Sequence, residues 1–76
     1  MDANQARMGR AALKLSVRDV AALAKVSPNT VTRVEAGLPA NNSTIMAIRI
    51  ALESAGVEFT NSDQPGVRMR KGPQSK

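Results

Sequence analysis

Seventy-six residues leave room for one domain with a small core, and chains this short often gain stability from a partner subunit. The absence of cysteine and histidine excludes disulfides, thiol chemistry and the usual zinc sites. Eleven basic and six acidic residues give a net charge of +5, which favours a polyanionic partner, and a single aromatic residue argues against single-stranded nucleic acid.

Two helices are predicted in the first third of the chain. Residues 1–4 are expected to fray, and small or apolar residues at helical spacing predict a helix over residues 5–14. Ser16 and Asp19 match a capping box, which predicts a second helix over residues 17–24. The N-terminus lacks the apolar stretch of a secretory signal, and no apolar run approaches the roughly 18 residues that span a bilayer.

A third helix is predicted directly after a tight turn. Residues 25–27 provide the turn, and Ser27 caps a helix over residues 28–36. Pro28 suits the first helical position, and Gly37 is placed to end the helix. This helix therefore carries its own start and stop signals.

A fourth, longer helix follows a loop rich in turn-forming residues. Ser43 or Thr44 is expected to cap it, and Gly56 to end it after Ala55. Apolar residues form two rows along this helix, which indicates that it packs against two neighbouring elements.

The pattern beyond this helix changes to a period of two. Residues 57–60 and 67–70 alternate, with strong turn chemistry at residues 61–66 between them, which predicts a small β-hairpin. Residues 71–76 form a polar tail that is expected to be disordered.

The two central helices carry a family resemblance. The stretch 15-LSVRDVAALAKVSPNTVTRVEAG-37 resembles the helix-turn-helix of the Xre/Cro family, to which phage repressors belong, and the similarity extends over residues 6–52. It implies a mainly α, four-helix lambda-repressor-like domain. Residues 1–76 then form one domain with a helical core (residues 5–56), and a hairpin (residues 57–70) stands where the family normally has a fifth helix.

The resemblance implies that the third helix reads DNA. In relatives this helix lies in the major groove, and residues at its start contact base edges. The matching positions are Pro28, Asn29, Thr32 and Arg33. Asparagine can pair with adenine and arginine with guanine, each contact giving about 1–3 kcal/mol of discrimination. Without the flanking pattern, an ordinary solvated helix face would explain the same side chains.

Phosphate contacts are expected at helix N-termini and from nearby hydroxyl groups. The candidates are Ser16, Arg18, Thr30, Asn41, Asn42, Ser43 and Thr44.

Further positions follow from comparison with the family pattern. Arg10 and Glu35 stand where phage-repressor relatives form an ion pair between the first and third helices, so the same pair is expected here. Lys25 occupies a turn position with positive φ where relatives prefer glycine, at a cost of about 1–2 kcal/mol. Val17 replaces a glutamine that binds phosphate in relatives, and Arg18 beside it can substitute.

Six apolar side chains have two interpretations. They form a satellite core beneath the hairpin, or they form a dimer interface, with strands that could pair across subunits. The small core favours the interface. The six residues are Met46, Ile50, Val57, Phe59, Val67 and Met69.

The sequence therefore predicts a homodimeric bacterial transcriptional regulator, cytoplasmic and nucleoid-associated, that binds a pseudo-palindromic operator as repressor or activator. Activation would involve contact with RNA polymerase. No enzymatic site is expected, because the acidic residues are scattered and the serines lack a base. No cofactor or metal is expected either. A small-molecule ligand is not expected because the chain is too short for a separate ligand domain, and a membrane partner is not expected because the helices lack a strongly basic amphipathic face. The alternative is a protein-interaction module of the same fold, either an antiactivator or an antitoxin.

Overall fold

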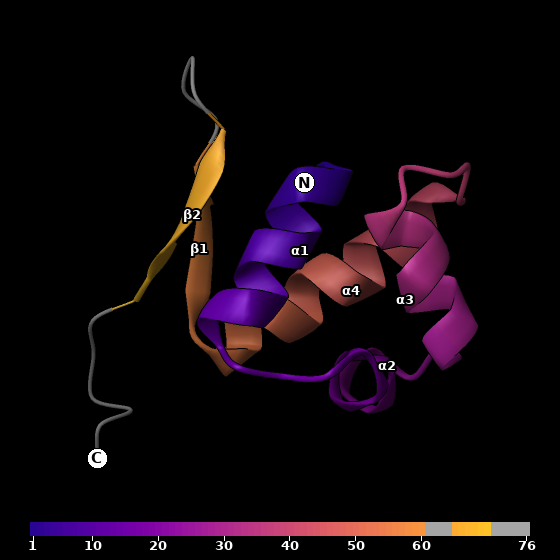
Figure 1. The fold of residues 1–76 in the computed structure, drawn as a ribbon, viewed down its shortest axis with the longest axis horizontal. Coiled ribbons are helices and arrows are strands. Elements are labelled where there is room, and N and C mark those ends of the chain that lie inside the picture. Colours follow the sequence, from indigo (N-terminus) through magenta and orange to yellow (C-terminus); the bar gives the residue numbers. More distant parts are fainter. Residues whose placement is uncertain (61–64, 71–76) are drawn as a thin grey trace.

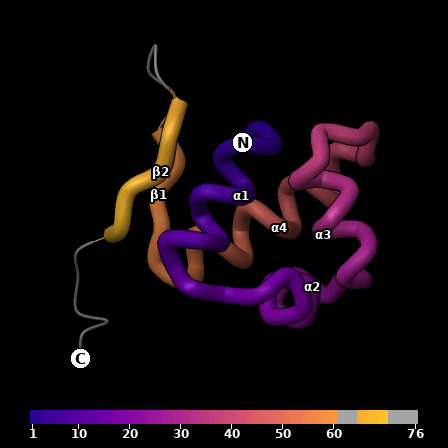
Figure 2. The backbone as a smooth tube through the Cα atoms, viewed as in Figure 1, coloured from indigo at the N-terminus to yellow at the C-terminus, as the bar shows by residue number. Residues whose placement is uncertain are grey.

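A computed structural model of the chain describes residues 1–60 and 65–70. Within these residues, four helices precede one antiparallel sheet of two strands, which confirms the mainly α class. Figures 1 and 2 show the sheet at one end of the long dimension, α3 at the other end, and α1 and α4 between them. No helix within the described residues is both long and apolar enough to cross a bilayer. The elements are α1 (Ala3–Ala12), α2 (Val17–Ala24), α3 (Pro28–Glu35), α4 (Asn42–Ala55), β1 (Val57–Thr60) and β2 (Gly66–Met69).

Helix α1 begins and ends two residues earlier than predicted. Asp2 caps it, because its Oδ1 accepts from the N–H of Gln5 at 2.8 Å. The Gln5 Oε1 in turn accepts from the N–H of Asp2 at 3.0 Å, which completes a capping box. The expectation that residues 1–4 fray is therefore wrong for the first turn of this helix.

Helices α2 and α3 follow their predicted signals. Ser16 and Asp19 exchange side-chain to backbone bonds of 3.0 and 2.9 Å, so the predicted capping box is present and α2 has the predicted bounds. The Ser27 hydroxyl caps α3 by accepting from the N–H of Thr30 at 3.1 Å. Gly37, at φ 78°, ends α3 in a Schellman motif, where a left-handed residue is required.

Helix α4 starts earlier than predicted. The cap is Asn41, whose Oδ1 accepts from the N–H of Thr44 at 2.9 Å, and neither Ser43 nor Thr44 takes that role. Four successive residues here can act as caps, and the loop from α3 decides between them. Gly56, at φ 127°, ends the helix as predicted.

The core lies where the four helices meet the first strand. Side chains from α2, α3, α4 and β1 contribute to it, and the small residues Ala6 and Ala21 let the helices approach closely. The largest fully buried side chains are Ile48, Leu52, Val20, Val31 and Val57.

The predicted hairpin forms within the chain. Val57 pairs with Met69 and Phe59 with Val67 in an antiparallel register. Helix α1 packs against the hairpin at Gly9, where a Cβ would make an ordinary contact of 3.4 Å with the Phe59 ring. Most of the predicted turn (residues 61–64) and the predicted tail (residues 71–76) lie outside the described residues.

The side chain of Gln5 fastens the hairpin to α1. It is 3% exposed, and its Nε2 donates to the carbonyl oxygens of Thr60 at 2.8 Å and Gly66 at 3.1 Å. One amide therefore binds both strands at the end of the hairpin next to the turn, which gives the short hairpin the support that an isolated one lacks.

Candidate nucleic-acid interface

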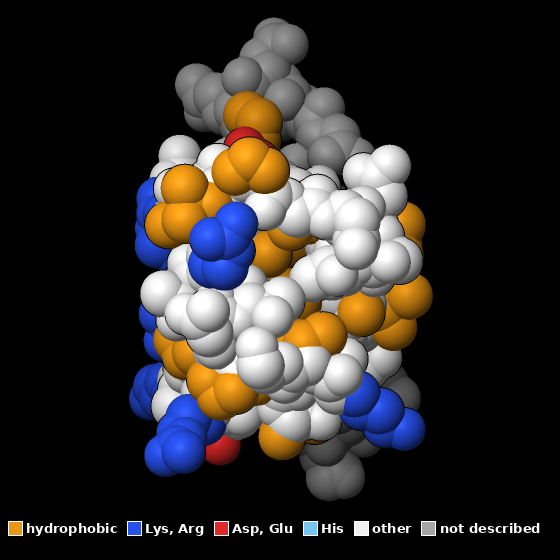
Figure 3. Space-filling model, turned by 90° about the vertical axis from the view of Figure 1, so that its right-hand side faces the viewer, with side chains coloured by type: hydrophobic (Ala, Val, Ile, Leu, Met, Phe, Trp, Pro, Cys, Tyr) orange, Lys and Arg blue, Asp and Glu red, His pale blue; other side chains and the backbone are white. Residues whose placement is uncertain are grey.

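Helix α3 has one buried and one exposed face. Val31 and Val34 pack into the core. All four of the predicted base-contacting residues are exposed: Pro28, Asn29, Thr32 and Arg33. Figure 3, which views the α3 end of the molecule, shows mainly uncharged surface, with lysine and arginine side chains around its edge and little acidic surface. The exposed face of α3 is therefore polar to basic in character.

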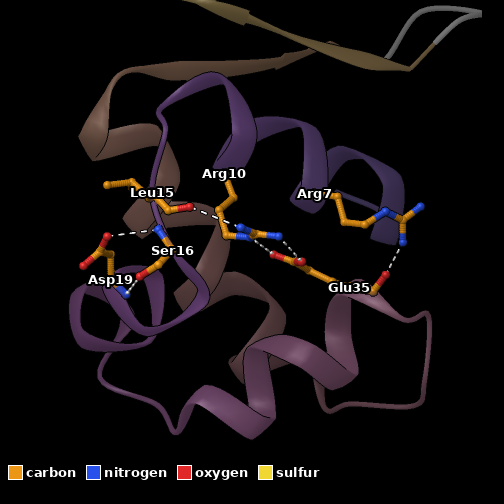
Figure 4. Close-up of polar contacts among 6 residues, drawn as sticks. All are labelled: Arg7, Arg10, Leu15, Ser16, Asp19 and Glu35. Atoms are coloured by element: carbon orange, nitrogen blue, oxygen red, sulfur yellow. Dashed lines mark hydrogen bonds and ion pairs between the residues drawn. The ribbon is translucent and has the colours of Figure 1, made fainter.

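An ion pair holds the C-terminal end of α3 against α1. Arg10 Nε donates to Glu35 Oε2 at 2.7 Å and Arg10 Nη2 donates to Glu35 Oε1 at 3.0 Å, so the predicted pair is present and bidentate (Figure 4). The hydrogen bonds to Glu35 raise the pKa of Arg10, and partial burial of Arg10 opposes this shift. Arg10 also donates to the Leu15 carbonyl at 3.2 Å, and Arg7 donates to the Glu35 carbonyl. These bonds fix the orientation of α3 without using its exposed face.

The connection between α2 and α3 is a three-residue turn that begins with a left-handed lysine. Lys25 has φ 60° and ψ 43°, as the resemblance implied. The Val26 N–H donates to the Ala21 carbonyl at 3.0 Å and the Lys25 N–H donates to the Ala22 carbonyl at 3.3 Å, which is the Schellman pattern. The two carbonyl bonds offset part of the strain at a non-glycine residue.

A left-handed lysine also ends α1, and this helix end was not predicted from the sequence. Lys14 has φ 58°, and its N–H donates to the Ala11 carbonyl at 3.0 Å. The Leu15 N–H donates to the Arg10 carbonyl at 3.1 Å. Two exposed lysines therefore occupy the positions at which glycine usually ends a helix.

The predicted phosphate contacts lie at three helix starts. Ser16 and Arg18 are exposed at α2, and Thr30 is half-buried in the first turn of α3, where its hydroxyl lies 2.8 Å from that of Ser27. At α4 the Ser43 hydroxyl donates to Asn41 Oδ1 at 2.9 Å. Asn41, Asn42 and Ser43 are exposed there and Thr44 is half-buried. The carboxamide of Asn41 keeps its N–H donors available, because its oxygen makes the capping bond.

Acidic side chains in the described part of the chain are all engaged. Glu35, Glu53 and Glu58 form ion pairs with Arg10, Arg49 and Arg68, Asp2 caps α1, and Asp19 completes the capping box of α2.

The cations near α2 and α3 are not neutralised. The side chains of Lys14, Arg18 and Lys25 have no hydrogen bond or ion pair within the described residues. Arg33 donates only to the Pro39 carbonyl, at 3.3 Å. These four side chains thus place positive charge on α2, α3 and the turns that precede them, and Arg7, which donates to Asn4 and to the Glu35 carbonyl, adds to it from α1.

The six predicted interface residues divide into buried and exposed groups. Val57 is fully buried in the core, which removes it from any interface and corrects that assignment. Phe59 and Val67 are half-buried, and Arg49 lies over the Phe59 ring at 5.9 Å. Only Met46, Ile50 and Met69 are strongly exposed.

Comparison with known proteins adds no assignment. No protein-family model matches the chain, and no curated protein matches it.

Proposed function

We propose that this protein is a sequence-specific, double-stranded DNA-binding transcriptional regulator of the Xre/Cro type. In this proposal α2, the turn at residues 25–27 and α3 form a helix-turn-helix, and α3 enters the major groove. The observation that carries the proposal is the exposed face of α3, which combines asparagine, threonine and arginine with no acidic side chain. Such a face suits the donor and acceptor pattern of base edges beside phosphates.

Base readout is assigned to the first two turns of α3. Asn29 can bond adenine N6 and N7, and Arg33 can bond guanine O6 and N7. The Arg33 bond to Pro39 is exposed and long, so the guanidinium is free to turn toward a base. Pro28 and the methyl group of Thr32 are suited to apolar contact with thymine methyl groups. Proline has no backbone N–H, so Pro28 cannot donate a hydrogen bond.

Phosphate binding is assigned to the cations and helix starts around α3. Arg18 and Lys25 supply charge, and the free N–H groups at the starts of α2 and α4 attract phosphate oxygens. The ion pair between Arg10 and Glu35 holds α3 in the orientation that these contacts need.

A homodimer completes the proposal. Two copies related by a two-fold axis would bind a pseudo-palindromic operator in the bacterial nucleoid, with half-sites about 34–36 Å apart. A regulator of this kind represses by covering a promoter or activates through RNA polymerase.

The test is selection of a binding site from a random duplex DNA library, followed by affinity measurements at several salt concentrations. The selected site should be bound with a steep loss of affinity between about 50 and 200 mM salt. Arg33→Ala should weaken binding to this site by about 5- to 150-fold, the equivalent of one bidentate base contact. Arg68→Ala is the matched control, because it removes the same charge from an exposed ion pair on the hairpin.

The outcomes separate the proposal from its rival. Enrichment of one sequence, with Arg33→Ala impaired and Arg68→Ala unchanged, supports DNA reading by α3. If no duplex is retained at low salt, the operator proposal fails and the protein-interaction module becomes the better explanation. Equal losses in both variants would mean that only net charge matters.

A further inference from the structure

An open apolar groove runs between α2 and α4. Its volume is about 370 Å³, and Leu23 on α2 and Ile50 on α4 stand at its sides. Small side chains line the space between them: Ala24, Ala47, Ala51 and Ala55. The groove therefore has room for large apolar side chains that this chain does not itself supply.

Large apolar side chains project beside the groove. Leu23 is 53% exposed, Ile50 is 52% exposed, and Met46, one turn before Ile50 on α4, is 50% exposed. Leaving these side chains half in water forgoes part of the stabilisation that full burial would give. Met46 and Ile50 are among the interface residues predicted from the sequence, and Leu23 is not.

Helix α4 carries both parts of a self-complementary contact. Met46 and Ile50 are four residues apart and form a raised row along the helix. Ala47, Ala51 and Ala55 repeat at the same spacing and form the low row beside it. Packing of such a row into the groove of another helix is the commonest mode of helix contact. A second α4 satisfies both rows at once.

We infer that this groove is the surface through which two copies of the chain associate, with the row of Met46 and Ile50 of each copy seated in the groove of the other. The inference rests on the proposed homodimer and names the surface that forms it. A two-fold axis makes the contact isologous, so every groove and every row is used.

Charge supports a second copy as the occupant. The groove contains no acidic residue and has one cation, Lys25, at its border. Two chains of charge +5 repel each other, and they approach with least repulsion where their surfaces are nearly neutral. A basic partner would find no complementary charge in this groove, and an acidic partner would find only Lys25.

The hairpin is the less suitable surface. Its outer face lies at the opposite end of the molecule from α3 (Figure 1), so a dimer through that face would point the two α3 helices in opposite directions. The groove instead reaches Lys25, two residues before the cap of α3.

Sedimentation equilibrium of the full chain without DNA tests the inference. Over protein concentrations from about 1 µM to about 1 mM, the mass should rise from 8.0 kDa toward twice that value, because interfaces this small bind weakly. Ile50→Gln should weaken the association at least tenfold, and Met46→Gln gives a second test if that variant folds poorly. Met69→Gln is the matched control, because Met69 is 51% exposed but lies on β2.

Each result decides one point. Loss of dimer in Ile50→Gln with Met69→Gln unchanged supports the groove. The reverse pattern moves the interface to the hairpin and overturns the inference, as does a chain that stays monomeric at all concentrations. A monomer that still binds its selected DNA site would refute the groove dimer while leaving DNA binding intact, and a groove dimer that binds no DNA would do the opposite.

Discussion

Substitution of one partner of the ion pair between Arg10 and Glu35 should lower the free energy of unfolding more than most surface substitutions do. The Glu35 side chain is 9% exposed, and the Arg10 side chain is 26% exposed. Arg10→Met leaves a carboxylate without its two guanidinium bonds in a site that water scarcely reaches. Glu35→Gln leaves a guanidinium that still donates to the Leu15 carbonyl and can turn toward solvent. The two single changes should therefore differ, and Arg10→Met should be the more damaging.

The magnitudes follow from burial. An uncompensated buried charge costs about 3–5 kcal/mol, so this is the expected loss for Arg10→Met. For Glu35→Gln the loss of charge assistance in two bonds predicts about 1–3 kcal/mol. Single domains have about 0.05–0.15 kcal/mol of stability per residue, or roughly 4–11 kcal/mol for 76 residues. Arg10→Met thus removes a large part of the total.

Urea unfolding followed by far-ultraviolet circular dichroism measures these differences. The double variant with Arg10→Met and Glu35→Leu should lie within about 1 kcal/mol of the wild type, because apolar replacement of both partners removes the desolvation cost as well as the attraction. Glu35→Leu as a single variant closes the cycle, and the loss in the double variant minus the losses in Arg10→Met and Glu35→Leu gives the coupling energy. The slope of the unfolding curve should stay unchanged, since the same surface is exposed in each case.

Two results would refute this reasoning. Single changes that each cost less than about 0.5 kcal/mol would mean that the pair behaves like an exposed one. A double variant whose loss equals the sum of the single losses would mean that the two residues act independently. If Arg10→Met does not fold, Glu35→Gln and the double variant still provide the comparison.

Two further changes probe α1 and α2. Gly9→Ala should stabilise the chain by about 0.5–1 kcal/mol, because alanine favours a helix interior and its methyl would meet the Phe59 ring at 3.4 Å, an ordinary contact. A loss of stability in urea would contradict this, and Gly9→Val is the variant expected to destabilise. Hydrogen bonds from the Ser16 N–H and hydroxyl hold the pKa of Asp19 below its ordinary 3.8. The ionised Asp19 therefore makes its full contribution to the free energy of unfolding above pH 3.8, and that contribution is lost as the pH falls through the lowered pKa. Asp19→Asn should reduce the dependence of the unfolding free energy on pH in that range, and an unchanged dependence would remove Asp19 as its cause.

Local sequence signals predicted a helix start correctly where only one nearby residue could cap the helix. The bounds of α2 followed from Ser16 and Asp19, because a capping box specifies its helix start within four residues. The start of α4 was missed because Asn41 is one of four neighbouring residues that can all act as caps. For α1 the signal was available, since Asp2 and Gln5 have capping-box spacing, but the chain terminus was assumed to fray.

Long-range contacts were beyond the reach of local patterns. The ion pair of Arg10 with Glu35 was expected only through family resemblance. Alternation predicted the hairpin but not that Val57 would be fully buried, because its burial depends on α1 and α4. Leu23 lies on the predicted α2, and only the packed structure reveals that it is exposed beside α4.

The side-chain amide of Gln5, near the start of the sequence, binds backbone carbonyl groups of the hairpin, near its end. Its partners are 55 and 61 residues away, so these bonds require closure of loops that include most of the protein. Helices α2 to α4, by contrast, are joined through short connections. We therefore expect the helices to assemble first and the hairpin to dock late, as a slow step governed by contact order. The protein thus combines helices joined by short connections, which can form quickly, with a contact between Gln5 and the hairpin that closes a loop of most of the chain.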